Sequence, residues 1–307
     1  MKRFGAAFAA TVCISGIASA QQAAVERVRA STPAVTLGET GSLKMIEEER
    51  GEVVEINAAP AAAPKFRVTV QMNVEHQSNA ALSPARHVDD WLLLPSLEAG
   101  WNTPLGRGFS LDVALRADLA KYLRLDESTY WGSSATALLE YRARPQWPRI
   151  YVGGQGYRYD LIDPSREITR AGALLAGFDV SRAFHGGRTQ LAAGYQFAKY
   201  WASPAVEDRV SNAVFVTATR QLHGALYAQV AYSFQATAFD RQSILDREGF
   251  HERNDNRQTV SAGLIYAFSN DAFLRLYATY LRNHSNNPFA DYENFTGGIG
   301  SALTLRF

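Results

Sequence analysis

From residue 66 onward, apolar and polar side chains alternate one by one along the chain. In the first such segment Phe66, Val68, Val70, Met72 and Val74 alternate with Arg67, Thr69, Gln71, Asn73 and Glu75. Alternation with a period of two places successive side chains on opposite faces of a β-strand. The pattern therefore predicts strands that have one apolar face and one polar face.

Segments of this kind recur about every 20 residues, and twelve of them can be counted up to the C-terminus. Each is about as long as a tilted strand that crosses a membrane. Their approximate ranges are 66–77, 90–102, 109–122, 131–142, 149–160, 168–181, 188–200, 210–221, 224–237, 257–268, 271–282 and 292–307.

The connections between these segments alternate in length. Long connections follow the odd segments, at 78–89, 123–130, 161–167, 201–209, 238–256 and 283–291, and short ones follow the even segments. Long outer loops, short periplasmic turns and both termini on the inner side are typical of outer-membrane barrels. We therefore predict an all-β fold, a closed antiparallel transmembrane β-barrel of about 12 strands.

Composition removes two other classes of protein. The chain has 31 Lys and Arg against 30 Asp and Glu, whereas a nucleic-acid partner would require a basic excess. After the N-terminus, no stretch approaches the roughly 20 consecutive apolar residues that a membrane-spanning helix needs. We therefore expect neither a nucleic-acid partner nor a helical membrane bundle.

The N-terminal part divides into two further segments. Residues 1–20 carry Lys2 and Arg3, a short apolar stretch and a small-residue site at Ala18–Ala20, which predict a cleaved signal peptide. Because the only cysteine, Cys13, lies inside it, the mature chain has no thiol chemistry. Residues 21–65 are rich in Ala, Glu and Pro, which predicts a flexible periplasmic tail before the barrel at 66–307. The tail is also a candidate docking segment for a periplasmic partner.

The last strand carries the most specific signal. Leu303, Leu305 and Phe307 alternate with polar or small residues and end the chain on phenylalanine. This ending resembles that of the outer-membrane β-barrel proteins of Gram-negative bacteria. The chain as a whole is similar to the porin-like, uncharacterised barrels among them. The resemblance implies a place in the bacterial outer membrane, contact with its lipid and lipopolysaccharide, and recognition of the three residues by the barrel-assembly machinery.

The polar face of the strands supplies the candidate lumen. Either these side chains line a path for small hydrophilic solutes, or opposite charges pair across neighbouring strands and fill the interior. Because both signs are mixed, no ion preference follows. The charged residues expected on this face are Arg67, Glu75, Glu98, Asp112, Arg116, Asp118, Glu140, Arg142, Arg275 and Arg306.

A second hypothesis, from another class of function, rests on the end of the first strand. Parity places His76 and Ser78 on the lipid side, where a histidine could take the proton of a serine that attacks a lipid ester. The string from His76 to Asn79 resembles the motifs of outer-membrane phospholipase A and lipid A deacylase. By that resemblance His76 is the base and Ser78 the nucleophile. The chain departs from the motif in having Ala80 where glycine often follows.

The remaining histidines show no metal-ligand spacing, and no cofactor motif occurs, so we expect no bound metal and no cofactor. Barrel closure would nevertheless gather His76, His87 and His284 on one side, with Asp89, Asp90 and Asp291 nearby, as a weak divalent-ion or lipopolysaccharide contact. The sequence favours a non-enzymatic protein: a narrow porin-like channel or a structural surface barrel. The lipid hydrolase is the alternative.

Overall fold

The structure is a computed structural model, and it describes residues 66–84, 87–144, 147–163, 165–246 and 249–307. The predicted signal peptide at 1–20 and the predicted tail at 21–65 lie outside these residues. In the described part, no helix is long and apolar enough to cross a membrane.

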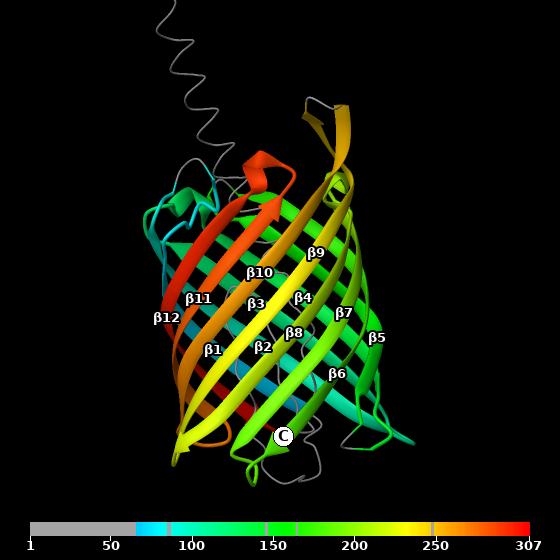
Figure 1. Ribbon diagram of the computed structural model, residues 1–307, viewed down its shortest axis with the longest axis vertical. Helices are drawn as coiled ribbons and strands as arrows, with labels where there is room; N and C mark the ends of the chain where they lie inside the picture. Colours follow the sequence, from blue (N-terminus) through cyan, green and yellow to red (C-terminus); the bar gives the residue numbers. More distant parts are fainter. Residues whose placement is uncertain (1–65, 85–86, 145–146, 164, 247–248) are drawn as a thin grey trace, which may run out of the picture.

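Twelve strands follow one another along the described chain and wind around one axis (Figure 1). Three short 3-10 helices, η1 (Asp126–Ser128), η2 (Ala205–Glu207) and η3 (Pro288–Ala290), lie between strands. The strands are β1 (Phe66–Gln77), β2 (Asp90–Gly106), β3 (Phe109–Tyr122), β4 (Tyr130–Tyr141), β5 (Arg149–Leu161), β6 (Arg166–Phe184), β7 (Thr189–Ser203), β8 (Arg209–His223), β9 (Leu226–Asp246), β10 (Gly249–Ala267), β11 (Ala272–Ser285) and β12 (Tyr292–Arg306).

The sheet is a closed antiparallel barrel, as the alternation predicts. Each strand pairs with its neighbours in sequence, and β1 pairs with β12 from Arg67 opposite Arg306 to Gln77 opposite Thr296. In lipid each unpaired backbone group costs several kcal/mol, about as much as several ordinary hydrogen bonds. Closure pairs the groups that an open edge strand would leave exposed.

The strand bounds match the expected ranges closely, with one clear difference. Residues 238–256 are expected as a long loop, but the described part of this range, 238–246 and 249–256, continues β9 and β10 instead. Above Phe239 on β9 and before Asp255 on β10, these strands have each other as their partner in the described ladders. They form a hairpin that projects beyond the barrel at the long-loop end (Figure 1). Charged residues alternate there without an apolar face, and this polar pattern looks like a loop.

Two-residue turns at the opposite end use left-handed backbone. The β2–β3 turn has positive φ at Gly106, Arg107 and Gly108. A Cβ on Gly108 would lie 2.5 Å from the Arg142 carbonyl oxygen, so this position requires glycine for space as well as for conformation. The start of β1 and the end of β12 lie at this short-turn end.

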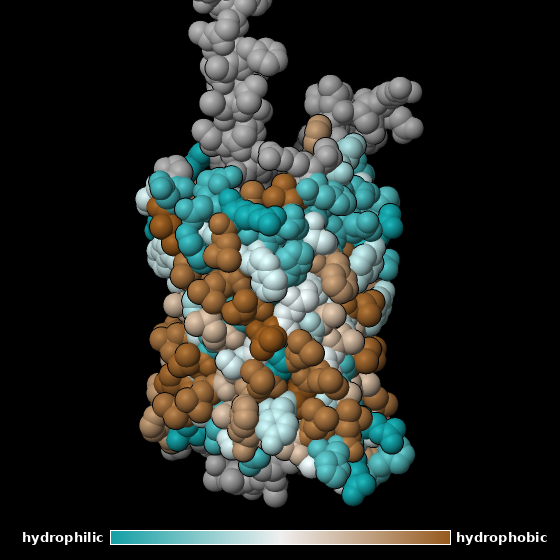
Figure 2. All heavy atoms as spheres, turned by 90° about the vertical axis from the view of Figure 1, so that its left-hand side faces the viewer, coloured by the Kyte–Doolittle hydropathy of each residue, from teal (hydrophilic) through white to brown (hydrophobic). Residues whose placement is uncertain are grey.

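The two faces of the sheet differ in polarity. Outward positions expose large apolar side chains such as Val70 (52%), Leu115 (58%) and Leu276 (57%). Figure 2 shows a broad hydrophobic band on one side of the barrel, below a hydrophilic long-loop end. Inward positions carry most of the buried charged and amide side chains. This is the arrangement that a barrel in lipid requires.

Candidate functional site in the barrel lumen

Near the short-turn end, a belt of buried charges begins on β1 to β3. The guanidinium of Arg67 lies 3.5 Å from a carboxylate oxygen of Glu98 and 3.2 Å from one of Asp112. The side chains of all three are at most 9% exposed. Removing charges from water is costly unless opposite charges lie close together. The buried Arg67 therefore stabilises the charges of Glu98 and Asp112, and the two carboxylates stabilise that of Arg67.

The belt continues on β4 to β6. Arg149 donates from Nη1 to Glu140 at 2.9 Å and from Nε to Asp179 at 2.8 Å. Arg142 lies 3.8 Å from Asp179 on the other side. We call the seven residues Arg67, Glu98, Asp112, Glu140, Arg142, Arg149 and Asp179 the charge belt. It holds four carboxylates and three guanidinium groups, all on the inner face at one end of the barrel.

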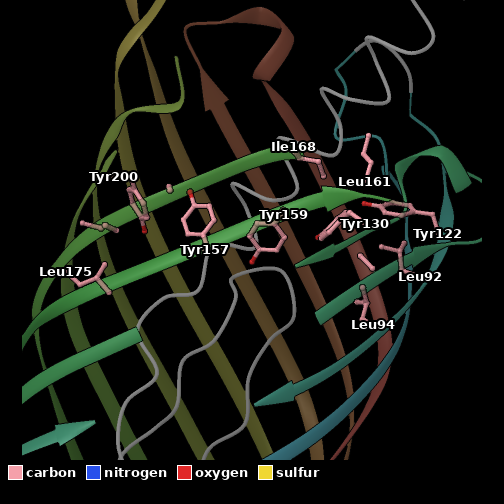
Figure 3. Close-up of a cluster of buried hydrophobic side chains, with 14 of the residues drawn as sticks. Leu92, Leu94, Tyr122, Tyr130, Tyr157, Tyr159, Leu161, Ile168, Leu175 and Tyr200 are labelled. Atoms are coloured by element: carbon pink, nitrogen blue, oxygen red, sulfur yellow. The ribbon is translucent and has the colours of Figure 1, made fainter. Parts of the chain in front are cut away.

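Above the belt, the inner face carries a cluster of buried apolar and aromatic side chains from β2 to β8 (Figure 3), which we call the aromatic wall. Its six tyrosines are Tyr122, Tyr130, Tyr151, Tyr157, Tyr159 and Tyr200. Tyr130 meets Tyr159 edge to face at 5.7 Å between ring centroids. The Arg209 guanidinium lies over the Tyr200 ring at 4.2 Å and donates to the Tyr157 hydroxyl at 3.1 Å. These edge-to-face and cation–π contacts fix the rings in one arrangement.

The rest of the inner face is mainly polar. On β1, every inward position from Arg67 to Gln77 carries a polar side chain. The Tyr277 hydroxyl donates to Glu75 at 2.8 Å, and Arg275 donates to Asn73 at 3.3 Å. We call the inward polar residues of β9 to β12 and β1 the polar wall; its buried members include Thr69, Asn73, Glu75, Gln77, Ser233, Thr237, Arg257, Thr259, Arg275, Thr279, Asn283, Asn294 and Thr296.

The structure gives each charged residue expected in the lumen a definite place. Eight are buried on the inner face: Arg67, Glu75, Glu98, Asp112, Arg116, Asp118, Glu140 and Arg275. Arg142 is partly buried, and Arg306 lies at the short-turn rim, where its Nε is 3.0 Å from Asp271. Many of them pair with opposite charges, within a strand, as Arg116 with Asp118 at 3.8 Å, or between strands.

The sequence pattern alone does not place several of the buried charged side chains in the lumen. Arg149 opens β5 directly after an irregular turn, and Asp179 lies on β6, where alternation is weak. Arg253 and Asp255 fall in the stretch that was expected to be a loop. Their side chains pair at 2.5 Å, and Ser285 donates to the same carboxylate at 2.6 Å. The spacing of Arg253 and Asp255, two residues apart and so on one face of a strand, is the sequence feature that could indicate this pair.

The expected hydrolase pair lies on the outer side of β1, but the two side chains have different partners. The Ser78 hydroxyl accepts from the Phe295 backbone N–H at 2.9 Å. His76 packs edge to face against Trp91, and its Nε2 lies 3.6 Å from Asp89. Among the described residues no hydrogen bond joins His76 to Ser78. The geometry thus assigns Ser78 to the β1–β12 junction.

The histidine cluster at the outer rim is not assembled. Within the described residues no group of three or more His, Cys, Asp or Glu side chains could hold a metal ion. His284 pairs with Asp291 at 2.8 Å, while His87 is exposed to solvent. Asp90 was expected to join the cluster; it is instead fully buried and holds backbone N–H groups.

The C-terminal strand presents its predicted recognition residues on the outside. Leu303, Leu305 and Phe307 are 48%, 49% and 70% exposed. The Phe307 N–H donates to the Phe66 carbonyl oxygen at 2.9 Å, so this residue also closes the barrel seam.

No known sequence family and no curated protein matches the chain. Solved structures do match. The β domain of the Bordetella autotransporter BrkA is 12% identical, with a TM-score of 0.45, over 78% of this chain and 100% of that one. LpxR from Salmonella typhimurium is 9% identical, with a TM-score of 0.44 and the same coverages. The anion-selective porin from Comamonas acidovorans is 9% identical, with a TM-score of 0.39, over 78% and 98%.

This likeness concerns the barrel fold alone. The closed antiparallel barrel and its apolar outer band belong to the bacterial outer membrane.

Proposed function

We propose that the protein is a narrow channel for small hydrophilic solutes. The observation that supports this function is the polar inner face of β1, which has no apolar position from Arg67 to Gln77. Several of these side chains are paired, as Glu75 is with Tyr277, and a polar interior of this kind is typical of membrane barrels that hold a water-filled path. A strand that is polar along its whole inward face supports a lumen that admits water and polar solutes.

The charge belt is the proposed constriction. Its side chains are long, come from neighbouring strands and meet near the periplasmic mouth, where Arg149 lies between Glu140 and Asp179. Long, paired side chains narrow a bore, and fixed charges at a narrow point act strongly on passing ions.

Conductance in a planar bilayer tests the proposal. We expect a small, salt-dependent unit current from the purified protein. Arg149→Gln leaves Glu140 and Asp179 without their shared cation, so the reversal potential in a salt gradient should shift toward cation preference. The matched control is Arg220→Gln, because Arg220 is exposed on the outer face near the same end. Absence of current from the intact protein and both variants would favour a purely structural barrel.

A further inference from the structure

On the lipid-facing side, β5 and β6 place two arginines directly opposite each other. Arg158 is the ladder partner of Arg170, and the same row continues to Ser133 on β4 and Ser203 on β7. The arginine side chains are 53% and 63% exposed. Both lie a few residues from the outer ends of their strands. The row therefore lies on the long-loop side of the apolar band.

Like charges directly opposite on neighbouring strands are destabilising. Two carboxylates reduce this repulsion. Asp160 accepts from Arg158 at 2.8 and 2.9 Å, while Glu167 lies 3.7 Å from Arg158 and 3.6 Å from Arg170. The contacts of Glu167 are longer than hydrogen bonds. In the described structure, the exposed guanidinium of Arg170 has no closer carboxylate than this.

Directly below the arginines, the outer surface is hollowed. The next outward row of the ladder is Ala135, Gly156, Gly172 and Trp201, from β4 to β7. A groove of about 530 Å³ follows this surface, and its lining includes Val113, Ala137, Gly154, Gly172 and Trp201. The floor is made of small residues, and the bulky walls belong to β3 and β7.

Nothing in the described barrel requires glycine on this floor. A Cβ on Gly172 would meet no heavy atom within 4 Å, and one on Gly156 would meet the Ala171 carbonyl oxygen at 4.0 Å. Glycine inside a strand costs stability and often marks a place where a ligand approaches the backbone closely. Space is thus left open on the lipid side, next to two cations.

We propose that this outer face binds a phosphorylated lipid of the outer leaflet. Its phosphate lies on Arg158 and Arg170, with Ser133 and Ser203 on either side, and one acyl chain fills the groove over Gly156 and Gly172. Guanidinium groups bind phosphate through charge-assisted, often bidentate hydrogen bonds. An acyl chain in the groove gains the packing contacts that an open hollow lacks. This site is independent of conduction through the lumen.

Binding of diphosphorylated lipid A to the purified barrel, measured by native mass spectrometry, tests the headgroup half of the site. Replacing both arginines, Arg158→Gln with Arg170→Gln, should weaken binding by about tenfold or more. The control is Arg282→Gln, since Arg282 is also exposed on the outer face near the long-loop end but belongs to β11. Circular dichroism verifies that each variant is folded. Equal binding by the double variant and the intact protein would overturn the proposal.

Filling the groove tests the acyl half. Gly172→Leu should weaken lipid A binding while both arginines remain. Gly297→Leu is the control, because a Cβ on Gly297 also meets nothing within 4 Å but this residue lies on β12.

Inorganic phosphate should compete poorly, and phosphatidylcholine should bind weakly. Strong competition by phosphate would reduce the site to an anion contact. A dimer in the lipid-free barrel that Gly172→Leu abolishes would assign the groove to a second copy. Either result would overturn the proposal.

Discussion

At the scale of single residues, Asp90 shows how one carboxylate can organise an outer loop. Asp90 begins β2, and its side chain accepts from the backbone N–H groups of Trp91 at 2.7 Å, Arg124 at 2.9 Å and Leu125 at 2.9 Å. A carboxylate that accepts several N–H groups satisfies donors that a bent loop cannot pair with its own carbonyl groups. The connection between β3 and β4 is thereby fixed to the neighbouring strand.

We expect Asp90→Ala to loosen this connection. The substitution leaves partly buried N–H donors without their charged acceptor, which costs about 1–3 kcal/mol of unfolding free energy. Hydrogen exchange should accelerate at the amides of Arg124 and Leu125 and remain unchanged in the strands beyond Trp91. Asp163→Ala is the control, because Asp163 is exposed in the next outer loop. Unchanged exchange at both amides would show that the loop has another anchor.

At the scale of elements, the β9–β10 hairpin differs from the rest of the sheet. Its outer part pairs Gly249 with Asp246 and Phe250 with Leu245, whereas β8 joins β9 up to Phe239 and β11 joins β10 from Asp255. The ladder of this outer part is therefore separate from the closed ring of strands.

We predict that the hairpin tip can be removed without loss of the barrel. Replacing residues 242–251 by an Asn-Gly turn removes no described ladder pair between β9 and β8 or between β10 and β11. The thermal unfolding temperature of the shortened protein should stay close to that of the intact chain. A marked fall would mean that the hairpin contributes to closure.

At the scale of the whole molecule, closure depends on the seam between β1 and β12. Eleven residue pairs join these strands, and the last residue completes the seam through backbone hydrogen bonds with Phe66. The side chains of Leu303, Leu305 and Phe307 are exposed on the outside, and the Phe307 ring packs against the Phe66 ring at 5.9 Å between centroids. Recognition of these side chains by the assembly machinery stays a prediction.

Phe307→Ala separates these two roles. The backbone pairing of the seam is kept, so refolding of the purified chain into detergent should remain near that of the intact protein. Insertion in cells should fall several-fold if the assembly machinery reads this side chain, and the amount of barrel in outer-membrane fractions measures it. The control is Phe268→Ala, since Phe268 is comparably exposed at the same end. Equal losses for both variants would remove the special role of Phe307.

The sequence predicted those features that depend on parity alone. The bounds of β1 and β3 agree with the alternation, because each strand has one face in lipid and one in the lumen. Parity also separates Ser78 from the lumen residues. Parity does not show which neighbour bonds to the Ser78 hydroxyl. In the structure this hydroxyl accepts from the N–H of Phe295 across the seam, and Phe295 is distant in sequence. The pairing of Arg149 with Glu140 on β4 and Asp179 on β6 likewise depends on how these strands are aligned with β5. A single sequence does not reveal this alignment.

The alternation does not reveal the outer hairpin, for a related reason. Outside the membrane, neither face of a strand needs to be apolar, so the alternation that marks a spanning strand disappears. The glycine floor of the lipid-facing groove was equally hidden, because Gly156 and Gly172 become neighbours through the pairing of β5 with β6.

The mutual backbone bonds between Phe66 and Phe307 have a consequence for the order of the chain. They bring the start of β1 and the end of β12 to the same point of the rim. The closed ring of strands therefore has no edge strand at which the order of the strands must start. A short linker between these two residues, with new ends opened in an outer loop, would keep every strand beside its present neighbours. The barrel should thus accept circular permutation, with its termini moved to the cell surface.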